Sequence, residues 1–211
     1  MIQTEVNSDS ISEKYRKYVL GMVLNSQLLY GLQGADTTTF NYDDKYLTDE
    51  HGAILLFRTI SSVVDYIQKD HFLAFDRDNL LGWAQEYRGS LPYSTFNLDR
   101  IHSLIKSTIS LHSLSQADTI EILMFINLFG DYAYQREQND PTLLLLHRHR
   151  EISTFFDFAY DNYVWDDPEH AGYRSLNELD FLRFDEAAFR RTIEQMLTVF
   201  THHMVVWKDA D

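Results

Sequence analysis

The stretch that decides the fold is Ser115–Arg136, with the sequence SQADTIEILMFINLFGDYAYQR. Its first four residues form a capping pattern, because the Ser115 side chain can accept a hydrogen bond from the backbone amide of Asp118. The residues that follow are apolar on most sides of a helix rather than along one stripe. Such a helix is covered by its neighbours, so the sequence predicts that residues 117–136 form a helix at the centre of the core.

Two more helices are predicted on the C-terminal side of this segment. Asp140 followed by Pro141 is typical of a helix start, since proline is tolerated at the first helical position. That helix should run to about Tyr160. The last helix should begin at Asp185 and reach Trp207, because apolar residues recur there at helical spacing.

Three helices are predicted on the N-terminal side of the central helix. Each begins at a side chain that caps helix N-termini and is followed by apolar residues at helical spacing. The three expected helices cover residues 59–68, 76–87 and 97–112. A loop rich in Gly, Pro and Ser is expected over residues 88–96.

Residues 10–57 combine a helical pattern with a β pattern. A capping pattern at Ser10 and apolar residues at helical spacing predict a first helix over residues 10–25. Short apolar, β-branched and aromatic runs then predict strands at 27–33, 37–42 and 53–57. The expected fold class is therefore α+β, mainly α: a helical bundle with a small N-terminal antiparallel β-sheet at about residues 27–57.

The length of the chain fits one domain. We expect a single domain over residues 1–211, in which the loop at 88–96 would separate an α/β part, 1–88, from a helical part, 97–211.

Composition limits the partners and the compartment. The 32 Asp and Glu residues against 18 Lys and Arg give a formal net charge of −14, which repels nucleic-acid phosphates and would steer a basic protein partner. The absence of Cys favours a reducing compartment. The N-terminal residues lack a signal-peptide pattern, and no segment approaches the ~20 apolar residues of a membrane span. We expect a soluble, cytoplasmic protein that binds neither nucleic acid nor membranes.

Sequence patterns of known catalytic sites are absent. The chain has no phosphate-binding loop, no G-x-G-x-x-G, no G-x-S-x-G and no H-E-x-x-H. Without cysteine it has no thiol nucleophile and no Cys-type zinc or iron–sulfur site. We therefore expect no enzyme and no cofactor.

Histidines give two metal-site hypotheses, both weaker than their structural alternatives. His147 and His149 point roughly 200° apart on a helix, so they cannot share a metal, and we expect an exposed basic turn there. A weak divalent-cation site is conceivable in a loop that holds Asp166, Asp167, Glu169 and His170. Loops rich in acidic residues are usually only solvated, so we expect no metal site.

Two polar residues interrupt the apolar central helix. Asn127 and Asp131 are four positions apart and share one face. We expect both to enter the core, where hydrogen bonds to neighbouring elements would fix the packing. A buried polar site is the functional alternative.

The segment 157–186 is the most informative for function. Nine of its residues are acidic and two are basic, and seven aromatic residues are interleaved with them. Aromatic anchors inside a charged rim are typical of binding surfaces, whereas the alternative is a solvated connection pinned to the core by its aromatics. The predicted partner-binding residues are Asp161, Tyr163, Trp165, Asp166, Asp167, Glu169 and Tyr173.

Three stretches resemble the bacterial toxin-immunity proteins, the antidotes of contact-dependent and polymorphic toxin systems. They are Ile54–Ile60 (ILLFRTI), Phe75–Trp83 (FDRDNLLGW) and Ile122–Asp131 (ILMFINLFGD), together under a quarter of the chain. None of them is a diagnostic motif, so the resemblance assigns no functional residue. It implies a cytoplasmic, non-enzymatic protein that binds one toxin, and many such toxins are basic nucleases.

The expected function is therefore a non-catalytic binding protein that neutralises a basic protein partner, such as a toxin nuclease domain. Two alternatives stay open at this point. One is a metal-dependent hydrolase that uses Asp, Glu and His side chains, and the other is a regulatory scaffold subunit.

Overall fold

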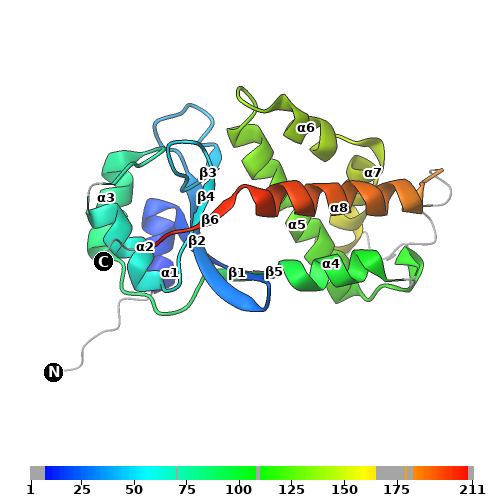
Figure 1. Ribbon diagram of the computed structural model, residues 1–211, viewed down its shortest axis with the longest axis horizontal. Coiled ribbons are helices and arrows are strands. Elements are labelled where there is room, and N and C mark those ends of the chain that lie inside the picture. The colour runs from blue at the N-terminus through cyan, green and yellow to red at the C-terminus, as the bar shows by residue number, and fades with distance from the viewer. Residues whose placement is uncertain (1–7, 70, 108–109, 165–178, 180–182, 209–211) are drawn as a thin grey trace. The chain divides into compact units, whose positions relative to one another are not determined.

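The computed structural model describes residues 8–69, 71–107, 110–164, 179 and 183–208 (Figure 1). The chain forms two compact units. The first unit is Met1–Asn97 with His203–Asp211, and the second unit is Leu98–His202. The second unit is thus inserted in sequence between two parts of the first.

The main sheet of the first unit has four strands in the order β3-β2-β1-β5. They are β1 (Lys17–Leu24), β2 (Gln27–Ala35), β3 (Asp44–Tyr46) and β5 (Ser94–Asn97). Strands β1 and β2 form a hairpin whose two turn residues, Asn25 and Ser26, have φ angles of 51° and 60°. Positive φ at both central residues matches the twist of a tight hairpin. Strand β5 runs parallel to β1, so the sheet is mixed rather than antiparallel.

The helix predicted over residues 10–25 is wrong beyond its first two turns. Helix α1 covers Ser8–Tyr15, and the following residues Lys17–Leu24 form strand β1. The continuous apolar run over residues 18–24 fits a buried strand as well as a helical stripe. Pairing with β2 along the whole of β1 decides in favour of the strand.

A second, two-stranded sheet brings the end of the chain back to the first unit. Strand β4 (Ile54–Leu56) pairs in parallel with β6 (Met204–Val206), which is drawn red beside it in Figure 1. The sheet predicted over residues 27–57 is therefore too narrow, because β1, β5 and β6 lie outside that range. The last helix ends at His202 instead of Trp207. The strand predicted at 37–42 is a loop between β2 and β3.

Helices α1, α2 (Ile60–Gln68) and α3 (Arg77–Glu86) form a hydrophobic core with the main sheet. Trp83, Phe57 and Leu32 are completely buried in it. The Thr59 hydroxyl accepts a hydrogen bond from the amide of Ser62, which confirms its predicted role as N-cap of α2. Asp76 precedes α3 as predicted, but its side chain makes no capping hydrogen bond.

The second unit is helical throughout its described residues. Its elements are α4 (Leu98–Lys106), the 3₁₀ turn η1 (Leu111–Ser113), α5 (Gln116–Gln135), α6 (Pro141–His147), α7 (Arg150–Tyr163) and α8 (Glu186–His202). Helix α5 contacts all four of the other α-helices, which confirms its central place. The Ser115 hydroxyl accepts from the Asp118 amide at 3.1 Å, as the capping pattern predicted. Phe125, Phe129 and Phe200 are fully buried, with ring centroids 6.0–6.4 Å apart.

The single helix predicted over 141–160 is divided into α6 and α7. The amide of Arg148 bonds back to the carbonyl of Leu144, and His149 then adopts an extended backbone with ψ of 139°. This extended residue ends the helical hydrogen-bond ladder and lets α7 start in a new direction.

One guanidinium ties the end of α4 to α8. Arg190 donates hydrogen bonds to the carbonyl oxygens of Leu104, Ile105 and Ser107, at 2.7–3.2 Å. It also pairs with Glu186 one turn earlier on α8 at 2.8 Å. Carbonyls at a helix C-terminus lack intrahelical partners, so Arg190 caps α4.

The fold class α+β is confirmed by these elements. In the part of the chain that the structure describes, no helix is long and apolar enough to cross a membrane.

Candidate functional site

Two of the seven predicted partner-binding residues lie at the C-terminal end of α7. Asp161 is exposed and Tyr163 is half-buried. Trp165, Asp166, Asp167, Glu169 and Tyr173 lie outside the described residues.

Helix α7 is amphipathic, and its outer face is acidic. Ile152, Phe155 and Ala159 are fully buried, and the ring of Phe155 lies 4.5 Å from the ring of Phe189 on α8. On the opposite side Ser153, Asp157 and Asp161 are exposed and recur at every fourth position. The period of the helix therefore places both carboxylates on one stripe that faces water.

Aromatic side chains border this acidic stripe. The rings of Phe156 and Tyr160 are stacked, with centroids 5.7 Å apart and planes 11° from parallel. Both are half-buried, so each leaves part of its ring at the surface. Burial also raises the pKa of the Tyr163 phenol above its usual value. We define Phe156, Asp157, Tyr160, Asp161 and Tyr163 as the α7 surface.

The charge of Asp161 is unfavourable for α7 itself. Asp161 lies in the last turn of α7, which contains no basic residue. The C-terminus of a helix carries partial negative charge, so a carboxylate there is repelled. No ion pair joins Asp157 or Asp161 to a cation among the residues that the structure describes. Asp161 thus does not stabilise α7 through the helix dipole.

The histidines of the α6–α7 junction do not form a metal site. The imidazole of His147 packs on Gly130 of α5, where an added Cβ would lie only 2.6 Å from its Nε2. Burial lowers the pKa of His147, which favours the neutral ring. His149 turns elsewhere, with its Nδ1 3.2 Å from a carboxylate oxygen of Glu151. His147 is half-buried, so the exposed basic turn predicted there is wrong at this residue.

Metal-binding geometry is missing more generally from the described ranges. Within them, no three His, Cys, Asp or Glu side chains come together in a way that could hold a metal ion. The loop proposed for a weak cation site, residues 166–170, lies outside those ranges. The described residues therefore bring no donor set together for a metal-dependent reaction.

The sequence predicts that the polar pair on α5 enters the core, and this prediction is wrong. Asn127 is exposed and Asp131 is half-buried. Helix α5 is covered on most sides, but the side that carries these two residues reaches the surface. Because most residues of this segment are apolar, the sequence did not indicate that one narrow side of the helix is polar and reaches the surface.

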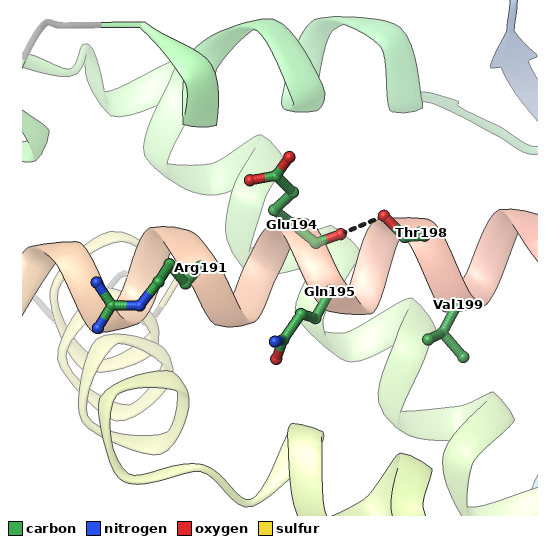
Figure 2. A pocket seen from close by; sticks show the side chains of 5 residues that line it. All are labelled: Arg191, Glu194, Gln195, Thr198 and Val199. Carbon is green, nitrogen blue, oxygen red and sulfur yellow. Dashed lines mark hydrogen bonds between the residues drawn. The ribbon is translucent and has the colours of Figure 1, made fainter.

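A shallow hollow of about 340 Å³ lies along the outer side of α8 (Figure 2). Its lining side chains are Arg191, Glu194, Gln195, Thr198 and Val199. The Thr198 hydroxyl donates to the Glu194 carbonyl of its own helix at 2.8 Å, and the Glu194 carboxylate pairs with Lys106 at 3.0 Å. These groups can hydrogen-bond a polar surface, but the hydroxyl is not paired with a base that would activate it as a nucleophile.

No protein-family model matches the chain, and no curated protein sequence matches it. Among solved structures, the chain is similar to one described as "The crystal structure of SatS c-terminal domain in complex with bromine". The similarity covers 93% of this chain and 96% of that chain, with a TM-score of 0.54 and 13% sequence identity. At this identity the likeness shows a shared fold and nothing about function.

Proposed function

We propose that this protein is a non-catalytic binding protein that neutralises a basic protein partner. The observation that carries the proposal is the α7 surface, where exposed carboxylates without a described cation lie beside half-buried aromatic rings. Carboxylates that oppose the dipole of their own helix cost stability. Positive charge on a basic partner would relieve this repulsion, which favours binding, and would also speed association.

The distribution of charge supports the same proposal. The second unit contains 17 acidic and 9 basic residues, and segment 157–186 alone contains nine of the acids. A field of one sign attracts an oppositely charged partner over distances near the Debye length, about 8 Å at physiological salt. Association should therefore be fast at low salt and should weaken as salt rises.

Within this proposal the partner is a bacterial toxin, such as a basic nuclease domain, and the protein is its cytoplasmic antidote. The resemblance of three stretches to immunity proteins supports that identity. The proposed anchors are Tyr163, Trp165 and Tyr173, with Asp161, Asp166, Asp167 and Glu169 as the charged rim.

The test begins with capture of partners from the native lysate at low and moderate salt, followed by purification of the recovered protein. Binding of the purified pair is then measured for Asp161→Lys and for Glu137→Lys. The second variant is the control, because Glu137 is also exposed in the second unit but lies outside the α7 surface. We expect Asp161→Lys to weaken affinity roughly tenfold or more at low salt, mainly through slower association, and Glu137→Lys to do much less.

Neutralisation itself is tested by producing the partner in cells with and without this protein. Growth arrest by the partner alone, relieved by co-production, is the expected result. Equal binding by Asp161→Lys and Glu137→Lys would remove the α7 surface from the proposal. A monomer that captures no basic protein would contradict the function, and metal analysis of that sample would then test the hydrolase alternative.

A further inference from the structure

The most exposed aromatic side chain described in the first unit lies on the loop between β2 and β3. Residues 36–43, which we define as the Phe40 loop, place Phe40 at 98% exposure and Tyr42 at 50%. A fully exposed Phe side chain contributes no hydrophobic free energy to folding, because its ring stays in water. Single exposed apolar residues are common, so the structure of the loop around Phe40 decides what it means.

The loop is closed at its base by Asp36. The backbone amide of Asp36 donates to the Asp43 carbonyl at 2.9 Å. Its carboxylate accepts from the Thr38 hydroxyl and from the Lys45 ammonium, each at 2.6 Å. Asp36 is itself buried, so these bonds are partly shielded from water and hold the base of the loop in place.

A second set of hydrogen bonds joins the loop to Asp76, the residue before α3. Thr37 donates from its amide and its hydroxyl to the carboxylate of Asp76, at 3.1 and 2.9 Å. Asp76 in turn pairs at 2.8 Å with the ammonium of Lys17, whose side chain is completely buried. The tip of the loop is therefore presented on a fixed base. A surface that is ordered before binding loses less conformational entropy when a partner arrives.

The aromatic tip has an acidic border. Tyr42 adopts a positive φ of 53°, which is uncommon for an aromatic residue, and the guanidinium of Arg16 lies 5.5 Å from its ring. Asp43 and Asp44 are exposed next to it. Segment 36–50 contains five acidic residues against the single base Lys45, which is engaged by Asp36. Arg16 also lies close enough to Asp44 to interact with its carboxylate electrostatically.

We propose that the Phe40 loop is a docking element that inserts Phe40 into an apolar pocket of a basic protein partner. Charge selects this occupant, because a second copy of a chain with net charge −14 and the anionic headgroups of a membrane would both be repelled by Asp43 and Asp44. Aromatic anchors inside a charged rim are the usual centres of binding energy. The inference rests on the proposed function, since it requires the basic partner.

The experiment uses the full chain and the basic protein recovered and purified as described above. Affinities are measured by titration calorimetry for the wild type, Phe40→Ala and Phe72→Ala. Phe72 is the matched control, because it is a second exposed Phe of the first unit, at 51% exposure, and lies outside the Phe40 loop. We expect Phe40→Ala to bind roughly 30-fold more weakly or worse, Phe72→Ala to bind within about twofold of wild type, and all three to melt alike.

A photo-crosslinking residue at position 40 identifies what the loop contacts. An adduct with the basic partner at apolar residues is the expected product. Equal affinity of Phe40→Ala and wild type, an adduct only between two copies of this chain, or loss of binding to phosphatidylserine vesicles in Phe40→Ala would each overturn the inference. If Asp161→Lys weakens binding and Phe40→Ala does not, the proposed function stands and this inference fails. If the wild type binds no basic protein, both fail.

Discussion

At the scale of single residues, the least expected feature is the buried ion pair between Lys17 and Asp76. Their side chains are 0% and 4% exposed, and Asp76 takes a left-handed backbone with φ of 46° to reach the ammonium. Lys17 also donates to the Ala35 carbonyl at 2.6 Å. Buried charges persist in proteins only when they are paired and hydrogen-bonded, so this pair joins β1, α3 and the Phe40 loop through one network.

Replacing Lys17 by Met should destabilise the first unit strongly. The change leaves the Asp76 carboxylate buried without its cation, and breaking such a pair typically costs about 3–5 kcal/mol. Urea unfolding measures the loss. Lys14→Met is the control, because Lys14 forms a similarly short pair with Glu86 that is exposed to solvent, and its loss should change stability little.

A double variant separates charge from packing at this site. Asp76→Asn in the Lys17→Met background keeps one of the two acceptor oxygens that Thr37 uses and removes the unpaired charge, so it should recover part of the stability lost in Lys17→Met. If Lys17→Met and the wild type had the same midpoint of urea unfolding, the ion pair would not hold the Phe40 loop in place.

At the scale of elements, the sequence predicted helices well where their ends carry local signals. Ser115 and Thr59 cap α5 and α2 through the hydrogen bonds that their positions suggested. The apolar character of α5 correctly placed it in the core. Strands β5 and β6 were missed because each pairs with a strand that is distant in sequence: β1 ends 70 residues before β5 begins, and β4 precedes β6 by about 150 residues. Strand β1 was mistaken for helix although its partner β2 follows it directly, because a short apolar run fits both structures.

The candidate surfaces were predictable to different degrees. The density of acidic residues in segment 157–186 pointed to Asp161, which α7 exposes. The Phe40 loop was mistaken for a strand because Thr37–Tyr42 is β-branched and aromatic. One signal could have corrected this interpretation: Asp36 followed by Thr38 is the arrangement in which a carboxylate accepts the amide two residues later and turns the chain.

Capping of α4 by Arg190 leads to a prediction at the same scale. Arg190→Lys keeps the positive charge but loses the planar fork that serves three carbonyl oxygens and Glu186. We expect a loss of about 1–3 kcal/mol in stability and faster hydrogen exchange in the last turn of α4. Arg191→Lys, an exposed neighbour on α8, is the control and should leave both quantities unchanged. Unchanged exchange in Arg190→Lys would show that α4 ends without this cap.

At the scale of the whole molecule, the chain closes the first unit with its last described residues. The polypeptide leaves that unit after Asn97, builds the second unit, and returns at His203. On its return the His203 carbonyl accepts from the Ile54 amide and the Trp207 amide donates to the Leu56 carbonyl, both at 2.7 Å. Completion of the first unit thus depends on residues that are more than a hundred positions away from its other strands.

Truncation after His202 tests this dependence. It removes β6 together with Trp207, whose ring lies 4.8 Å from Tyr66 and 5.1 Å from His71. Loss of a large aromatic side chain and of a strand from a core costs on the order of 3–5 kcal/mol, so we expect the melting temperature of the first unit to fall by roughly 6 °C or more. Hydrogen exchange should quicken in β4, which loses its paired strand. Truncation after Trp207 keeps β6 and should melt with the wild type. If both truncated chains melted like the full one, β6 would be a peripheral strand, and the return of the chain would not stabilise the first unit.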